Sequence, residues 1–304
     1  GAGHGRPRHA RPRADRMTRD ACLPVGAAAI RTGAPEGDFD AWPTGARAAR
    51  SARRNAKERG TMADARRTAL VTGGVQGLGA AAARALAEAG VEVAVAHLGA
   101  GERAEAFGRD TGMPVFEWDV SDFDACAKGV ADVEAALGPL DILVNNAGVN
   151  RDVMFHKMDR ADWDAVMRVD LDSMFNVTRH VIGGMRDRGF GRVVNISSVN
   201  AARGQAGQTN YCAAKAGVEG FTRALARESA GKGVTVNAVA PGYADTPMVD
   251  AVPDEIMEGI LANVPLSRLA EPGEIGRCVR FLASDDAGFI TGATLPVNGG
   301  LRMG

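Results

Sequence analysis

The chain has 304 residues, of which 45% are apolar, and a formal net charge of −1 at pH 7. This length suffices for one large α/β domain or two small ones. No apolar run is long enough to cross a bilayer, so we expect no membrane segment. Residues 62–304 carry 23 Lys and Arg against 31 Asp and Glu, which gives no reason to expect nucleic acid as a partner.

Residues 1–61 form a basic segment, with 13 Lys and Arg against 6 Asp and Glu. The segment is rich in Arg, Ala, Gly and Pro and has no sustained apolar period, a composition that predicts disorder. Three interpretations of the segment compete: a transit peptide, a basic arm that binds an acidic surface, and translated upstream sequence that precedes a true start at Met62. We favour the last, because the folded pattern begins shortly after Met62. Residues 62–304 are then expected to form a single domain.

The cysteines lie far apart and match no spacing of a metal site. They predict free thiols in a reducing compartment, and we expect a cytoplasmic protein without a bound metal. The four are Cys22, Cys126, Cys212 and Cys278.

From Thr68 onward the pattern alternates strand, turn and helix. A short apolar strand at 69–71 runs into a glycine-rich loop, and a helix follows that Gly90 ends; a second strand spans 91–96. In this context, glycines let backbone N–H groups approach a pyrophosphate at the positive helix N-terminus. The unit therefore predicts a dinucleotide site, with a purely structural turn as the alternative. The loop residues are Gly73, Gly74, Val75, Gln76, Gly77, Leu78 and Gly79.

The same alternation continues to the C-terminus. It predicts an α/β protein with a doubly wound parallel sheet, a Rossmann fold with helices on both faces. Further strands are expected at residues 115–119, 140–144, 192–196, 234–239 and 293–297. Helices are expected at residues 122–137, 159–188, from before 211 to about 230, 254–262 and 271–283.

One helix carries Tyr211 and Lys215, four residues apart and hence on the same face. The pKa of a tyrosine phenol is about 10, and a neighbouring ammonium lowers this pKa because it favours the phenolate. Ser198, at a strand end, is placed to hold a carbonyl oxygen as it gains negative charge. The alternative is an ordinary alanine-rich helix. Since the glycine loop, Asn146, Ser198 and Tyr243 all follow strand ends, we expect them to converge on one cleft.

The runs TGGVQGLG, NNAG, YCAAK and PGY, together with Ser198, resemble the short-chain dehydrogenase/reductase family over residues 66–304. This resemblance implies hydride transfer from a nicotinamide cofactor, with Tyr211 as general acid and Ser198 orienting the carbonyl. Lys215 is implied to lower the tyrosine pKa and to hold the nicotinamide ribose. Besides the glycine loop, Tyr211 and Lys215, the implied cofactor contacts are Asp119, Val120, Asn146, Ala147, Gly148, Pro241, Gly242 and Ala244.

A closer resemblance is to the acetoacetyl-CoA reductases of polyhydroxybutyrate synthesis, through NNAGVNRDVMFHKM, VNISSVN and GQAGQTNY. It implies a homotetramer that uses NADP(H) to reduce a 3-oxoacyl-CoA. The alternatives are a 3-oxoacyl-[acyl-carrier-protein] reductase and a catalytically silent dinucleotide-binding protein. The implied acyl-CoA site, whose residues could instead be loop turn and solvated rim, comprises Asp152, Gln205, Gln208 and Tyr243, beside Ser198 and Tyr211.

Asp170 departs from the family, which usually has Asn at this fourth catalytic position. The family residue supports a water relay to the lysine, partly through its backbone carbonyl. A carboxylate here stabilises the lysine charge and opposes ionisation of Tyr211. We therefore expect lower activity or a higher pH optimum than in relatives with Asn.

The end of the second strand, Ala96 to Gly99, has no acid that would accept bonds from the 2′-OH of NAD. The absence leaves NADP possible, and Arg103 is the nearest arginine for its 2′-phosphate. The alternative is a solvated arginine paired with Glu102 or Glu105.

Overall fold

The computed structural model describes residues 1–3, 66–247, 249 and 254–303. In this part of the chain, seven strands form one parallel sheet in the order β3-β2-β1-β4-β5-β6-β7, and the order reverses between β1 and β4. This confirms the predicted doubly wound sheet. The strands are β1 (Thr68–Thr72), β2 (Glu92–His97), β3 (Val115–Glu117), β4 (Ile142–Asn145), β5 (Gly191–Ile196), β6 (Val234–Pro241) and β7 (Thr294–Val297).

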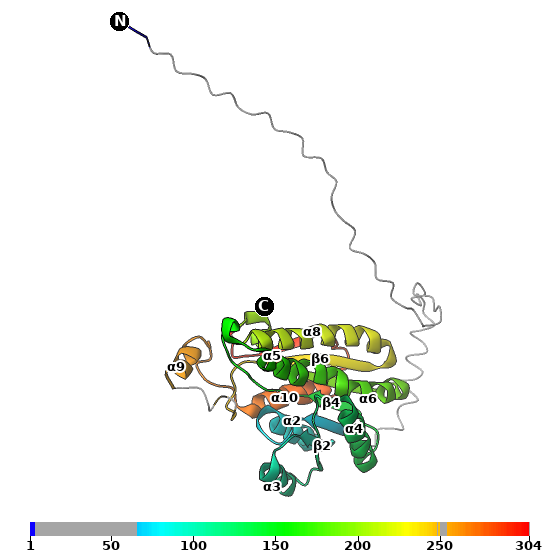
Figure 1. Ribbon diagram of the computed structural model, residues 1–304. Helices are drawn as coiled ribbons and strands as arrows, with labels where there is room; N and C mark the ends of the chain where they lie inside the picture. Colours follow the sequence, from blue (N-terminus) through cyan, green and yellow to red (C-terminus); the bar gives the residue numbers. More distant parts are fainter. Residues whose placement is uncertain (4–65, 248, 250–253, 304) are drawn as a thin grey trace. The chain divides into compact units, whose positions relative to one another are not determined.

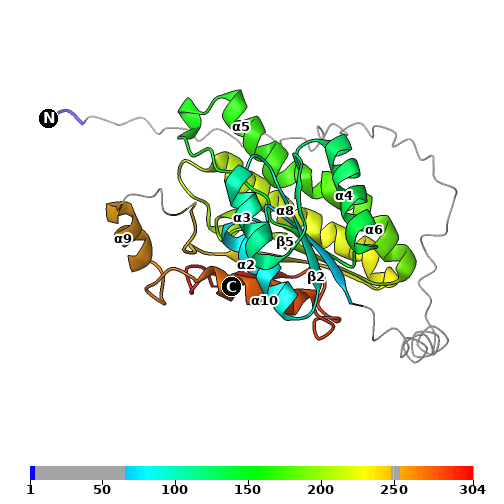
Figure 2. The ribbon, with the colours of Figure 1, turned by 90° about the horizontal axis from the view of Figure 1, so that it is seen from below.

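Helices cover both faces of the sheet (Figures 1 and 2). On one face α2, α3 and α10 pack over the sheet, and on the other α4, α6 and α8 do so. The central strands are buried on both faces and so read as almost continuous apolar runs. The helices are α2 (Gly77–Glu88), α3 (Gly101–Thr111), α4 (Phe123–Leu137), α5 (Arg160–Met167), α6 (Ser173–Arg188), α7 (Asn200–Arg203), α8 (Thr209–Ser229), α9 (Asp254–Ala262) and α10 (Pro272–Ala283); short 3₁₀ turns are η2 (Phe155–Lys157) and η4 (Ala230–Lys232).

The predicted continuous helix over 159–188 is wrong in its middle. A π-helical segment, η3 (Arg168–Asp172), separates α5 from α6 and contains Asp170. One extra residue per turn shifts the helix face there, a feature often found at functional sites. The four-residue helix α7, directly after Ser198, was also not predicted.

A buried chain of polar side chains runs along one face of the sheet, from α6 to α8. The Nδ2 of Asn145 donates to Thr178 Oγ1 at 3.0 Å and to Asn195 Oδ1 at 2.9 Å. The Nδ2 of Asn195 donates in turn to Thr222 Oγ1 at 2.9 Å. The two asparagines lie opposite each other on β4 and β5. The chain of hydrogen bonds therefore joins β4 to α6 at one end and β5 to α8 at the other.

Several expectations from composition concern particular segments. Cys126, Cys212 and Cys278 are free thiols, as predicted. No helix in the described ranges combines the length and apolar character that a bilayer crossing requires. Three predictions concern residues that the structure does not describe. They are the free thiol of Cys22, the start at Met62 and the disorder of residues 1–61, of which only residues 1–3 are described.

Candidate active site

A cavity of about 620 Å³ opens beyond the carboxyl ends of the strands. It brings together all four residues predicted to be catalytic, and the predicted convergence of strand-end loops is observed. The predicted residues that line it are Gly73, Gln76, Gly77, Leu78, Asn146, Ala147, Gly148, Asp152, Asp170, Ser198, Gln205, Gln208, Tyr211, Lys215, Pro241, Gly242, Tyr243 and Ala244.

The glycine loop fits the pyrophosphate of a dinucleotide. Helix α2 begins at Gly77, its N-cap Gln76 makes no side-chain capping bond, and its first turn has no acid. The helix therefore presents uncapped N–H groups and its positive end toward an anion. A Cβ on Gly79 would lie 2.2 Å from the Gly73 carbonyl oxygen, so only glycine permits this close turn. Asn146 holds the loop by donating from Nδ2 to the Thr72 and Gly73 carbonyls.

Six predicted cofactor residues do not line the cavity. Gly74 packs against the Val95 side chain and Val75 is buried, so they shape the loop from behind. Gly79 lies beneath the Gly73 carbonyl, as described above. The carboxylate of Asp119 accepts from its neighbour Ser121 N–H at 2.8 Å, and Val120 is buried. Exposed Arg103 donates to Gln76 Oε1, which places its guanidinium at the edge of the loop.

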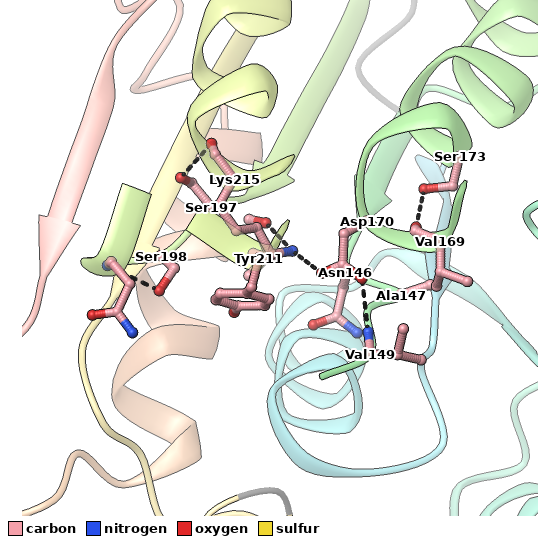
Figure 3. A network of polar contacts seen from close by, with 12 residues as sticks. Asn146, Ala147, Val149, Val169, Asp170, Ser173, Ser197, Ser198, Tyr211 and Lys215 are labelled. Atoms are coloured by element: carbon pink, nitrogen blue, oxygen red, sulfur yellow. Dashed lines mark hydrogen bonds and ion pairs between the residues drawn. The ribbon is translucent and has the colours of Figure 1, made fainter. Parts of the chain in front are cut away.

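Tyr211, Lys215 and Ser198 gather at one place in the cavity (Figure 3). Tyr211 and Lys215 share a face of α8, with the lysine Nζ 5.5 Å from the centre of the tyrosine ring. Lys215 is buried and donates to the Ile196 carbonyl at 3.1 Å. Ser198 Oγ accepts from the Asn200 N–H at 3.1 Å, so the hydroxyl hydrogen of Ser198 is not used in that bond.

Asp170 is fully buried and forms an ion pair with Lys215 at 3.1 Å. Its other oxygen accepts from the Val149 N–H at 2.8 Å, directly after the NNAG loop (Figure 3). The carboxylate thus links the lysine on α8 to the loop at the end of β4. Asp170 is the third of the five residues of the π-helical segment, whose shifted helix face carries the carboxylate toward Lys215.

The electrostatics of the site correct one prediction. Burial raises the pKa of the Tyr211 phenol above its usual value; Lys215 lowers this pKa as predicted, and a hydrogen bond with Ser198 lowers it too, but Asp170 and Asp152 raise it. The predicted net decrease in the pKa of Tyr211 is therefore wrong. Burial alone would lower the pKa of Lys215, yet Asp170 and Tyr211 outweigh it, and that pKa lies above its usual value. Tyr211 thus keeps its proton, and Lys215 its charge, at neutral pH.

The predicted substrate residues line the cavity, but two of them, Asp152 and Gln208, are bonded to each other. Gln208 is buried, donates to Asp152 at 2.7 Å and accepts from Asn200 at 2.9 Å. Sequence reasoning missed Asn200, because no motif distinguishes it within the run VNISSVN. It also missed the apolar residues that close the mouth from the α9 side, which are Pro247, Val249 and Ile260.

Residues 73–302 match a family model described as Enoyl-(Acyl carrier protein) reductase. The chain belongs to the short-chain dehydrogenase/reductase family. This is a family of oxidoreductases that use a nicotinamide dinucleotide, in agreement with the fit of the glycine loop.

Individual members of the short-chain dehydrogenase/reductase family are closely similar. An acetoacetyl-CoA reductase of Rhizobium meliloti is 58% identical over 235 residues, covering 77% of this chain and 98% of the relative. An acetoacetyl-CoA reductase of Shinella zoogloeoides is 56% identical over 235 residues, with the same coverage. A 3-oxoacyl-[acyl-carrier-protein] reductase of Haemophilus influenzae is 44% identical over 238 residues, covering 77% and 98%.

Asp170→Asn is expected to leave the reductase activity at neutral pH equal or higher. Asn keeps an acceptor for the Val149 N–H and removes the charge that raises the pKa of Tyr211. A lower tyrosine pKa makes a stronger acid, and it moves the alkaline limb of the reduction rate to lower pH, because the protonated phenol is required. The pH profile of kcat measures both effects. A sharp loss of kcat at neutral pH would show that the carboxylate has a role of its own.

Proposed function

We propose that this enzyme reduces a 3-oxoacyl-CoA with NADPH, converting acetoacetyl-CoA to (R)-3-hydroxybutyryl-CoA in polyhydroxybutyrate synthesis. The observation that carries the proposal is a single cavity that holds Tyr211, Lys215 and Ser198 beside a glycine loop suited to a dinucleotide. The names of relatives at 56–58% identity support the choice of substrate.

In this mechanism the bound nicotinamide supplies the hydride, and the protein supplies position and protons. Ser198 donates its hydroxyl hydrogen to the ketone oxygen. Tyr211 donates its proton to the same oxygen as negative charge develops there. Lys215 stabilises the resulting phenolate. The raised pKa of Tyr211 keeps the donor protonated at neutral pH, as the reductive direction requires.

The nearest alternative keeps this chemistry and changes the carrier to acyl-carrier protein, as the name of the Haemophilus influenzae relative suggests. The test compares kcat/KM for acetoacetyl-CoA and for the matching carrier-protein thioester. We expect preference for the CoA thioester, and the opposite preference would reject our choice. A catalytically silent dinucleotide-binding protein, the third possibility, would oxidise no NADPH with either substrate.

For the cofactor we propose NADP(H), with Arg103 holding the 2′-phosphate. The loop after β2 has already used two N–H groups: Gly99 donates to Glu117 at 3.0 Å and Ala100 to His97 at 3.3 Å. A phosphate there therefore needs a side-chain cation. Glu105 forms an ion pair with Arg109 and not with Arg103, which was the alternative considered for Arg103.

Arg103→Ala is expected to raise KM for NADPH by about tenfold and to leave KM for NADH nearly unchanged, because charge-assisted bonds to the phosphate are lost. Arg109→Ala, on the same helix, is the control and should alter neither value. Equal effects on both cofactors, or a wild type that prefers NADH, would refute the role of Arg103.

We further propose a cytoplasmic homotetramer whose native chain is the single domain 62–304. Among the exposed aromatic side chains of the described residues, Phe123 and Phe175 stack on α4 and α6, and Phe281 and Phe289 lie on and after α10. A fifth, Phe155, lies on η2. We take the surfaces at α4–α6 and at α10 as candidates for the two kinds of interface that a tetramer with two-fold axes has. Light scattering measures the mass, and N-terminal sequencing of native protein tests the start.

A further inference from the structure

Two side-chain hydrogen bonds and one backbone hydrogen bond form a chain that connects Asp152, in the lining of the cavity, to Ser198. Asp152 Oδ2 accepts from Gln208 Nε2 at 2.7 Å, and Gln208 Oε1 accepts from Asn200 Nδ2 at 2.9 Å. The backbone N–H of Asn200 donates to Ser198 Oγ at 3.1 Å. Gln208 and Asn200 are both buried, so water does not substitute freely for these bonds.

The carboxylate of Asp152 gives this chain its direction. An ionised carboxylate only accepts, so Gln208 must turn its NH₂ toward Asp152. Its carbonyl oxygen then faces Asn200, which must donate. A flip of either amide would bring two acceptors or two donors together in a buried place, at a cost comparable to a lost hydrogen bond.

Asn200 depends on this bond for its orientation. Its Oδ1 is buried and has no hydrogen-bond partner among the described residues, so the Gln208 contact alone anchors the amide. Asn200 is also the first residue of α7, a helix of only four residues. Its N–H determines which way Ser198 donates: because Oγ accepts from the backbone, the hydroxyl hydrogen is directed away from it.

We propose that Asn200 is the positioning residue of Ser198, and that Asp152 and Gln208 hold Asn200 in the orientation that leaves the serine a donor to the ketone oxygen. This inference rests on the proposed catalytic function of Ser198. It gives Asp152 and Gln208 a role in the chemical step besides any contact with the acyl-CoA.

The test is a double-mutant cycle on kcat for acetoacetyl-CoA reduction. Ser198→Ala is expected to lower kcat by about 10²–10³, as loss of a donor to a developing oxyanion does. Asn200→Ala should lower kcat by about tenfold with little change in KM for NADPH. In the Ser198→Ala background, Asn200→Ala should change kcat by less than about twofold, because the serine it positions is gone.

Asn237→Ala is the matched control, since Asn237 is a buried asparagine on β6 bonded to the backbone of Ile290 and Ala293, away from the cavity. It should lower Tm and leave kcat of the folded enzyme unchanged. Independent effects of Ser198→Ala and Asn200→Ala, multiplying in the double variant, would overturn the inference alone. A Ser198→Ala enzyme with wild-type kcat would instead refute the catalytic role on which it rests.

The direction of the chain has its own test. Asn200→Asp should lower kcat, because it sets a carboxylate against the Gln208 carbonyl oxygen, whereas Asp152→Asn keeps an acceptor for Gln208 and should change kcat little. The two substitutions together reverse both side-chain bonds and keep the net charge. We expect the paired variant to recover kcat to within about threefold of wild type. A paired variant no better than Asn200→Asp would overturn the argument from polarity.

Discussion

Tyr211→Phe is expected to lower kcat for ketone reduction by about 10²–10⁴ and to leave the fold and the affinity for NADPH nearly unchanged. Phe keeps the ring that packs near Lys215 and removes only the hydroxyl. The ion pair between Lys215 and Asp170 and the bond from Lys215 to the Ile196 carbonyl remain in place. Stopped-flow reduction and fluorescence titration with NADPH measure the two quantities separately.

Tyr243→Phe is the matched control, because Tyr243 is the only other tyrosine and also lines the cavity. Its hydroxyl is not assigned to proton transfer, so the variant should change KM for the acyl-CoA more than kcat. A Tyr211→Phe enzyme that retains most of its kcat would mean that another group protonates the alkoxide.

Lys215→Met should abolish measurable reduction, with kcat at least about 10²-fold lower, and should also destabilise the protein. Met fills the volume but leaves the fully buried Asp170 without its counter-charge. Removing one partner of a buried pair typically costs about 3–5 kcal/mol. For a domain of this size that corresponds to a decrease in Tm on the order of 10 °C, measurable by calorimetry.

The two effects separate in the variant that carries both Lys215→Met and Asp170→Asn. Removing the orphaned charge should restore most of the lost Tm, while activity stays absent because the ammonium beside Tyr211 is still missing. If the paired variant is no more stable than Lys215→Met, the buried charge is not the source of the destabilisation.

The sheet and the location of the site could be predicted because both depend on local patterns. Apolar strands such as β5, and the glycine loop before α2, can be recognised from a few consecutive residues. The rule that ligands bind beyond the carboxyl ends of parallel strands then joins Asn146, Ser198 and Tyr243 in one cavity without any knowledge of side-chain contacts.

What could not be predicted depends on contacts between distant segments. No sequence motif marks the π-helical turn around Asp170, so the segment was predicted as part of one continuous helix. The net pKa shift of Tyr211 is a balance of burial against Lys215, Asp170 and Asp152, which come from three parts of the chain. The engagement of Gln208 likewise depends on partners 8 and 56 residues away.

The polar chain through Asn145 and Asn195 has a consequence for how the chain avoids misfolding. Each asparagine finds its partner only if β4 and β5 are aligned with Asn145 opposite Asn195. A slip of one strand by one residue turns its asparagine to the other face of the sheet and leaves both amides without each other as partners in an apolar interior. It also displaces Ser198, three residues beyond Asn195, by about 3.3 Å relative to the NNAG loop. The asparagine pair therefore favours the correct alignment of β4 and β5: the misaligned sheet that would displace Ser198 also carries the free-energy cost of unpaired buried amides.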